Sequence, residues 1–435
     1  MSATSPAVEH EYLIYARVRE ELDGLAEERT PFATMEKDSE LSQALQDISC
    51  IPFIRFPVSD DWTPEKKCGF TISGVSAGTL RHPDVDVILK NSTPSAFGRG
   101  EETVLDPSYR SGREIPAEKI GFPDKEMLKT FGQDVQEGMF PGRKVEVKLY
   151  KLAVYEPDGH FDWHMDSTHS DTHNATLLVA LNTSWKGGDL VLRRNDIETH
   201  FDLQPEPPDG DSKEPTLKAV AFYTDTEHRV EPVTEGVRIV LQYDVEIGEK
   251  HDDDSDDGDE YTPWMDKFAD DYSRRMEYEA LMQATSDKAA VEKVITIISK
   301  MHKSRVKEVA FAMQHLYRKA SIIPHYLKGS DAVLYSALLA SGRFDVSLHP
   351  VVLREASDIE GALEKRYAYR VDGTTMSTSD ELPPLKKRKV SRKFHIPKFS
   401  AITQISSQHY VEHTGNEAVP AEYRYFGGGM FVRAK

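Results

Sequence analysis

Hydrophobic positions in the middle of the chain fall in short runs that predict strands. Between about Cys68 and Val245, β-branched and aromatic residues form such runs, which are separated by Gly, Pro, Asn and Asp. Runs of this kind are typical of strands that are joined by turns. They are VEVKLYKLAVY, ATLLVALN, GDLVLRR, TLKAVAFYT and VRIVLQYDV. The pattern predicts an antiparallel β sandwich or barrel.

Helical spacing of apolar residues flanks this β region on both sides. From Glu9 to about Asp47 the spacing predicts a short helical segment that is interrupted near Pro31. From about Trp264 to Gly342 apolar residues recur every three or four positions among good helix formers. We therefore expect a second, mainly helical region after the β domain.

Two polar segments mark boundaries between these regions. Residues 251–260, HDDDSDDGDE, are acidic at seven of ten positions, and such a run repels itself and cannot bury surface. A later segment rich in Ser, Thr and Pro ends in a block of Lys and Arg. We predict a helical preface (1–60), a β domain (61–250) and an acidic linker (251–260). After them we predict a mainly helical region (261–370), a disordered basic insert (371–393) and a strand-like end (394–435).

Composition narrows the classes of function. The formal net charge of −19 disfavours broad nucleic-acid binding, because an acidic surface repels phosphate backbones. Only two cysteines are present, which excludes a disulfide framework and a four-cysteine zinc site and fits a reducing compartment, nucleus or cytoplasm. The sequence has no run of about 18 apolar residues, so we expect no membrane span.

One extended segment offers a metal-binding pair. Residues 150–166 read YKLAVYEPDGHFDWHMD, a predicted strand, a turn and a second extended run. Alternate residues of a strand face the same side, so His164 and Asp166 can project together into a barrel interior. His160 and Asp162 have the same spacing, and because His160 is four residues earlier we expect it on the same side of the strand. We favour His164 and Asp166 and keep the other pair as the alternative.

Two more residues extend this pair to a set. His228 lies in AFYTDTEHRVEPV, where a predicted strand meets a polar turn. Two histidines and one carboxylate leave coordination positions open, which suits non-haem Fe(II). Arg238 lies among Val, Ile and Leu in the next predicted strand, where a guanidinium needs an anion and can clamp a carboxylate with two hydrogen bonds.

These motifs, together with the turn Gly187–Leu190, resemble the prolyl-4-hydroxylase-type Fe(II)/2-oxoglutarate oxygenases over residues 85 to 250. The sequence looks closest to uncharacterised fungal and protist members. The resemblance implies an α+β protein with a double-stranded β-helix (jelly-roll) core and flanking helices. It implies that His164, Asp166 and His228 bind Fe(II), that Arg238 pairs with the distal carboxylate of 2-oxoglutarate, and that Tyr155 contacts this cosubstrate.

The expected activity is a dioxygenase reaction that hydroxylates a protein residue and releases succinate and CO2. Its cofactors are then Fe(II), 2-oxoglutarate and O2, with ascorbate as a further candidate. A small-molecule substrate, a non-catalytic interaction module in the C-terminal half, and a cupin-type metal enzyme are the alternatives.

Other conspicuous residues have simpler interpretations. His169 and His173 fall in the polar loop STHSDTHN, where we expect solvated side chains. Gly427–Gly429 predict a bulge or turn between strands. Lys386–Lys389, in PPLKKRKV, resemble a nuclear import signal that an import receptor would bind.

Overall fold

The computed structural model forms two compact units, which we describe separately. One consists of residues 51–248, and the other of residues 26–50 and 288–435. The described residues are 26–27, 31–48, 50–58, 69–99, 102–122, 126–194, 197–208, 214–248, 288–357, 363–372, 392–398, 403–409 and 421–435. The predicted acidic linker and Lys386–Lys389 lie outside them. No helix in the described part of the chain combines the length and apolarity that a membrane crossing needs.

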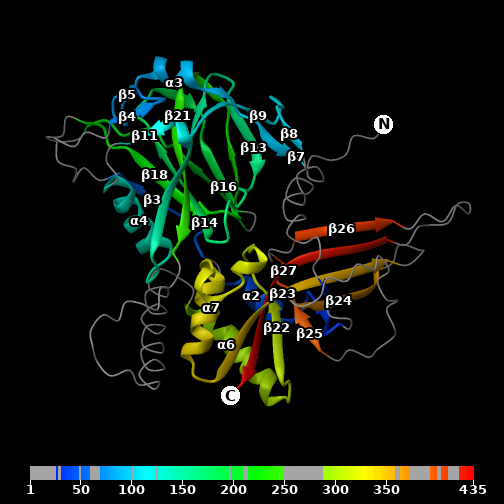
Figure 1. The fold of residues 1–435 in the computed structure, drawn as a ribbon. Helices are drawn as coiled ribbons and strands as arrows, with labels where there is room; N and C mark the ends of the chain where they lie inside the picture. The colour runs from blue at the N-terminus through cyan, green and yellow to red at the C-terminus, as the bar shows by residue number, and fades with distance from the viewer. Residues whose placement is uncertain are drawn as a thin grey trace, which may run out of the picture. The chain divides into compact units, whose positions relative to one another are not determined.

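The first unit is built on two antiparallel sheets (Figure 1). The larger sheet has the order β3 (Phe53–Pro57), β18 (Lys218–Tyr223), β14 (His173–Ala180), β21 (Arg238–Ile247), β12 (Val145–Tyr155), β10 (Arg113–Pro116) and β6 (Thr93–Pro94). The smaller has the order β17 (Ile197–Phe201), β16 (Leu190–Arg194), β19 (Glu227–Val230), β13 (His160–His164) and β9 (Arg110–Ser111). This is the predicted jelly-roll core.

One hydrophobic core joins the inner faces of these sheets. Leu178 and Val240 of the larger sheet pack in the same cluster as Leu192 and Val230 of the smaller one. Helix α4 (Glu126–Met139) places Met127, Phe131 and Val135 at a spacing of four residues, and all three are buried. The ring of Phe131 lies 5.9 Å from that of Tyr243 on β21, so α4 covers the outer face of the larger sheet.

Short elements complete the first unit. They are helix α3 (Val85–Asn91), the 3₁₀ turn η1 (Ala117–Lys119), the sheet of β4 (Gly69–Ile72), β5 (Val75–Thr79) and β11 (Ile120–Gly121), and the pairs β7 (Phe97–Arg99) with β8 (Glu102–Val104) and β15 (Trp185–Gly187) with β20 (Val233–Gly236).

The second unit contains a closed ring of six strands. Neighbours around the ring are β2 (Ala33–Glu36), β24 (Leu363–Asp372), β23 (Phe344–Ser357), β27 (Ala421–Ala434), β22 (Glu308–Ala312) and β25 (Lys393–His395), which pairs with β2 again. Strands β1 (Ala26–Glu27) and β26 (Thr403–His409) extend it. The pairs of β25 with β2 and with β22 are parallel, and the other pairs are antiparallel.

Every strand of the ring contributes to a single interior cluster, which makes the ring a filled barrel. Its members are Ala33, Ala310, Ala312, Val351, Leu353, Ala368, Phe394, Ile396 and Phe431. Small residues keep this narrow interior free of clashes. A Cβ atom added at Gly429 would lie 2.7 Å from Cγ2 of Val351. The prediction of a turn at Gly427–Gly429 is therefore wrong, because these glycines lie within strand β27.

Three helices pack on the outside of this barrel: α2 (Glu40–Gln46), α6 (Lys288–Lys303) and α7 (Gly329–Ala340). Short 3₁₀ turns η2 (Lys319–Ser321) and η3 (Pro324–Tyr326) precede α7. Apolar residues of α6 at Val291, Val294 and Ile298 predicted the helix correctly. Within the predicted mainly helical region, residues 261–370, the described residues also form strands β22, β23 and the start of β24, so this region combines helices with strands. Strands β26 and β27 lie in the segment 394–435, which was predicted to be strand-like.

The predicted helical preface at residues 1–60 also differs from the structure. Among its described residues only α2 is helical, whereas β1, β2 and β3 are strands. Strand β2 belongs to the barrel of the second unit and β3 to the larger sheet of the first. The preface is thus divided between the two units because its apolar residues complete two different sheets.

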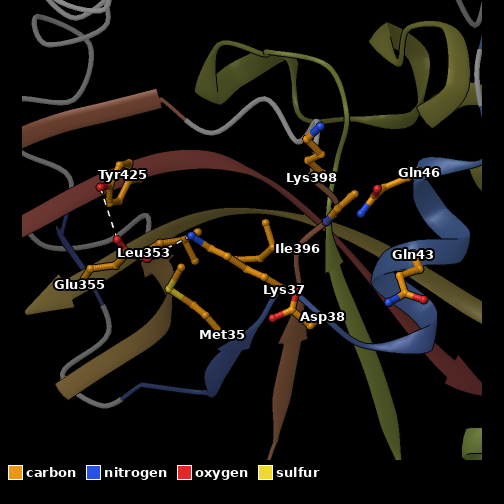
Figure 2. Close-up of a pocket in the computed structure, with 11 residues that line it drawn as sticks. Met35, Lys37, Asp38, Gln43, Gln46, Leu353, Glu355, Ile396, Lys398 and Tyr425 are labelled. Atoms are coloured by element: carbon orange, nitrogen blue, oxygen red, sulfur yellow. Dashed lines mark hydrogen bonds and ion pairs between the residues drawn. The ribbon is translucent and has the colours of Figure 1, made fainter. Parts of the chain in front are cut away.

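A pocket of about 620 Å³ opens at one end of the barrel (Figure 2). Met35, Leu353 and Ile396, from the barrel interior, line it together with polar residues of α2, of the short segment between β2 and α2, and of strands β23 and β27. Glu355 is buried there and pairs with Lys37 at 3.2 Å. Pockets of this size at barrel mouths are common ligand sites.

Candidate metal centre

Strands β13 and β19 bring two histidines together on the smaller sheet. His164, the last residue of β13, pairs in register with His228 on β19. Asp166 follows two residues after His164, and its Oδ1 lies 3.8 Å from Nε2 of His228. One ligand atom from each of these three residues lies within 4.8 Å of the other two. The structure thus places the predicted set in one cluster.

Hydrogen bonds to the backbone fix which nitrogen of each ring is free. Nδ1 of His164 lies 2.7 Å from the carbonyl oxygen of Asp162, and Nδ1 of His228 lies 3.0 Å from that of Thr226. A carbonyl only accepts, so each Nδ1 carries the proton and each Nε2 carries a lone pair. Metal-binding histidines are oriented in this way. Both rings therefore offer Nε2 as a ligand.

Asp166 is held ionised by its surroundings. Burial alone would raise the pKa of its carboxyl group, but the neighbouring His228, a hydrogen bond from Thr176, His173 and the ammonium group of Lys151 together lower that pKa below its usual value. Oγ1 of Thr176 donates this bond to Oδ2 at 2.5 Å. The carboxylate is therefore present at neutral pH, as metal coordination requires.

His164 is held neutral, mainly by burial. Desolvation lowers the pKa of His164 well below its ordinary value, and the neighbouring His228 lowers it further. The phenyl ring of Phe161 lies on the imidazole with centroids 3.4 Å apart. A neutral imidazole is the form that binds a metal ion, so the site does not need to release a proton from His164 before it binds one.

The alternative pair, His160 and Asp162, is not part of this cluster. The register of β13 shifts between Phe161 and His164, so the alternation that would put His160 beside His164 is broken. Both ring nitrogens of His160 lie near backbone carbonyl oxygens, those of Asp158 and Ser108. His160 thus bonds to the backbone of Asp158 and Ser108, while His164 lies beside His228.

Arg238 occupies the same interior, at the start of β21. It is 1% exposed, and its Nε and Nη2 have no hydrogen-bond partner among the described residues. Burial lowers the pKa of its guanidinium, and Tyr155, the partner of Arg238 in register on β12, opposes that shift. A side chain at Gly188 would approach Cδ of Arg238 to 3.1 Å, so glycine leaves space for it. These buried N–H groups can donate hydrogen bonds to a bound anion.

A second cluster of the same composition lies nearby and was missed from the sequence. His169, His173 and Asp244 also place three potential ligand atoms within 4.8 Å of one another. The expectation that His173 is solvated is wrong, since it is 3% exposed. The signal was present, because an acidic residue in an apolar strand, Asp244 in LQYDV, needs a partner when it is buried.

The two clusters differ in the nitrogens that remain free. Nδ1 of His173 accepts a hydrogen bond of 3.1 Å from the backbone N–H of His169, and its Nε2 lies 3.0 Å from the carbonyl oxygen of Ala175. One nitrogen accepts and the other donates, so His173 has no lone pair left for a metal. The first cluster is therefore the candidate metal centre.

The first cluster fits Fe(II) by the chemistry of its donors. Two neutral imidazoles and one carboxylate bind one side of an octahedral ion and leave positions open for other ligands. The unpartnered N–H groups of Arg238 fit the carboxylate of a dicarboxylate cosubstrate.

Comparison with known proteins supports this chemistry. Residues 150–243 match the family described as the 2OG-Fe(II) oxygenase superfamily. No curated protein matches the chain. The matched segment contains Tyr155, His164, Asp166, His228 and Arg238.

Several solved structures resemble the chain at low identity. A 2OG-Fe(II) oxygenase family oxidoreductase from Burkholderia pseudomallei is 11% identical, with 50% of this chain and 95% of that chain covered and a TM-score of 0.29. A prolyl-4-hydroxylase from Pseudomonas putida is 14% identical, with 48% and 100% covered and a TM-score of 0.29. A Trichoplax adhaerens prolyl hydroxylase, in complex with a hypoxia inducible factor peptide fragment, is 13% identical, with 47% and 89% covered and a TM-score of 0.30.

The family match and the donor set are independent observations on the same part of the chain. Both concern the same strands, from β12 to β21. The match of residues 150–243 to the 2OG-Fe(II) oxygenase superfamily and the donor set within them together support a 2-oxoglutarate-dependent dioxygenase that uses Fe(II), 2-oxoglutarate and O2.

Proposed function

We propose that His164, Asp166 and His228 bind the iron, that Arg238 and Tyr155 hold 2-oxoglutarate, and that the enzyme hydroxylates a residue of a protein or peptide. One oxygen atom of O2 enters the substrate C–H bond, and the other enters succinate as CO2 leaves. The iron supplies the oxidative chemistry when it is bound. The protein substrate is inferred from the resemblance of the sequence motifs to prolyl hydroxylases.

The side chains of this domain bind and orient the reactants. Nε and Nη2 of Arg238, which have no hydrogen-bond partner in the described part of the chain, can donate parallel hydrogen bonds to the distal carboxylate of 2-oxoglutarate. The Tyr155 ring has its centroid 5.3 Å from the guanidinium carbon of Arg238 and so closes one side of that position. Apolar residues of the surrounding core exclude water, which strengthens the charged contact.

The observation that carries the proposal is the fixed orientation of the two imidazoles. Both Nδ1 atoms are bound to backbone carbonyls, and so both lone pairs belong to the Nε2 atoms of one cluster with Asp166. Every neutral imidazole has one nitrogen without a hydrogen, and here the two such nitrogens lie in one cluster with a carboxylate.

Anaerobic titration of the full chain with Fe(II) and 2-oxoglutarate, followed by exposure to O2, tests the proposal. We expect succinate to form in proportion to O2 consumed, and His164→Ala to abolish it. His160→Ala is the matched control and should retain activity, because His160 is outside the cluster. Incubation with a peptide pool should then yield a product heavier by one oxygen atom.

Two outcomes would contradict the proposal. If succinate forms equally in wild type and His164→Ala, these residues are not the iron ligands. If iron binds but 2-oxoglutarate is not consumed, a cupin-type metal enzyme or a non-catalytic interaction module explains the chain better. A product found only among small molecules would overturn the choice of protein substrate and leave the residue roles intact.

A further inference from the structure

The loop between β13 and β14, residues 165–172, carries Asp166 and is tied down at several points. Thr176 on β14 holds the carboxylate of Asp166. Three residues further along, Nδ1 of His169 lies 2.6 Å from Oδ2 of Asp244, and the backbone N–H of His169 donates to His173. A loop that supplies a metal ligand needs such ties, because loops otherwise move more than strands.

Packing reinforces the same attachment. The imidazole of His169 lies against the ring of Tyr150, with centroids 4.3 Å apart, and against that of His173 at 5.2 Å. Oγ of Ser170 contacts Glu246 at 3.3 Å, and the backbone N–H of Ile247 donates to the carbonyl of Thr172. The second half of the loop is thus fastened to strand β21 by side chains and by backbone.

The anchoring residues are themselves placed by the larger sheet. Thr176, which holds Asp166, is the Cα partner of Asp244 in the pairing of β14 with β21. Asp244 is 9% exposed, with Nδ1 of His169 at 2.6 Å from its Oδ2 and Nε2 of His173 at 3.6 Å from its Oδ1, which has no hydrogen-bond partner among the described residues. The two ends of the loop therefore converge on one point of the sheet.

We propose that His169, bound to Asp244 and His173, is a positioning residue that holds the 165–172 loop so that Asp166 faces His164 and His228. The inference rests on the proposed iron site and adds a role for the second cluster. His169 does not touch the metal. It acts through the loop, and its loss should weaken metal binding without removing a ligand.

The test measures the affinity of the full chain for Mn(II), with free Mn(II) quantified by electron paramagnetic resonance, at fixed pH without 2-oxoglutarate. We expect one Mn(II) per wild-type chain. His169→Leu should bind it about 10-fold more weakly. This is the lower end of the loss of metal affinity expected when a residue that supports a metal ligand is replaced. His169→Asn places an N–H donor near the position of Nδ1 and should restore affinity to within about 3-fold of wild type.

His82→Leu is the matched control. His82 and Glu214 form an exposed His–carboxylate pair of the same chemistry at 2.9 Å in the same unit, away from the loop. Its loss should change Mn(II) affinity less than about 2-fold, because an exposed pair contributes little. The absorption spectrum of bound Co(II) should change in His169→Leu and not in His82→Leu, which separates altered ligand geometry from a general loss of stability.

Failures of the two proposals are distinguishable. If the wild-type chain binds no Mn(II), the proposed iron site is wrong. If it binds one equivalent and His169→Leu binds it equally well with an unchanged Co(II) spectrum, only the positioning role is wrong. Two equivalents, one lost in His169→Leu, would make the second cluster a metal site and also overturn it. Should His169→Leu not fold, Asp244→Asn carries the test, with a loss of roughly 3- to 10-fold expected.

Discussion

Two clusters of two histidines and one aspartate lie in the same domain and have opposite properties. In His164, Asp166 and His228, both imidazoles keep their Nε2 lone pairs because Nδ1 is bound to a backbone carbonyl. In His169, His173 and Asp244, the backbone occupies both nitrogens of His173. Residue composition and distance are therefore not enough to define a metal site, and the direction of each hydrogen bond decides which cluster can bind an ion.

The largest expected effect separates the two aspartates. Asp166→Ala removes a ligand and should weaken Mn(II) binding by more than about 100-fold. This loss exceeds the one expected when a residue that only hydrogen-bonds a metal ligand is removed. Asp244→Ala should have a smaller effect because it disturbs only the loop. Calorimetric titration of both variants checks this order, with Asp162→Ala as the control from the alternative pair. Equal losses in Asp166→Ala and Asp244→Ala would break the distinction.

A change at Arg238 tests whether the first cluster works with a cosubstrate. Arg238→Leu removes charge-assisted hydrogen bonds worth roughly 1.5–3 kcal/mol, so the Kd of 2-oxoglutarate should rise roughly 10- to 100-fold. The Kd of Mn(II) alone should stay unchanged, because Arg238 is not a ligand. Arg238→Lys keeps the charge and should lose less. Equilibrium binding in the presence of saturating Mn(II) measures both, and an unchanged 2-oxoglutarate Kd would remove Arg238 from its role.

Thr176→Val removes the hydrogen bond from Thr176 to Asp166 while the volume of the side chain stays nearly the same. Without the donated bond the pKa of Asp166 should rise, because this bond is one of the interactions that lower it against the effect of burial. On acidification the carboxylate is then protonated at a higher pH than in the wild type. The pH below which Mn(II) binding is lost should therefore rise. At neutral pH we expect about 10-fold weaker binding. Affinity measured between pH 5 and 8 checks both effects, and superimposable profiles would contradict them.

The smallest effect is expected at Tyr150. Its ring contacts His169, and an aromatic contact contributes roughly 0.5–1.5 kcal/mol beyond burial. Since the two hydrogen bonds of His169 remain in Tyr150→Leu, Mn(II) affinity should fall only about 2-fold. Titration beside His169→Leu gives the comparison. A loss larger than that of His169→Leu would mean that packing, rather than the bond to Asp244, holds the loop.

Strand periodicity predicted much of the first unit and its first cluster. Arg238 is buried among apolar neighbours, as the extended run around it predicted. His164 ends β13, but Asp166 lies in the loop that follows, so this pair meets through the loop and not through alternation along a strand. The register shift in β13 could not be predicted, because it arises from pairing with β19 and not from the local pattern. The second cluster was missed for a related reason, since His173 and Asp244 are 71 residues apart and meet only through the pairing of β14 with β21.

In the second unit local patterns predicted the helices better than the barrel. Helix α6 has a clear apolar stripe, whereas β23 and β24 begin after Gly342, where the helical spacing ends, although both begin within the predicted mainly helical region 261–370. Strand β2 joins this barrel from more than 300 residues away in sequence, through its pairs with β24 and β25. Its closure depends on contacts between distant segments, which no window of sequence contains.

Strand β21 carries Arg238 at one end and Asp244 six residues later, on the same side of the strand. A slip of one residue in its pairing during folding would turn both side chains outward together and bury their neighbours instead. Such a misregistered species would retain its sheet but lose the anchor for the cosubstrate and the tie for the loop in a single event. Pairing with β12 on one side and β14 on the other opposes that error. The position of Arg238 and the contact of Asp244 with the loop therefore both depend on the alignment of one strand.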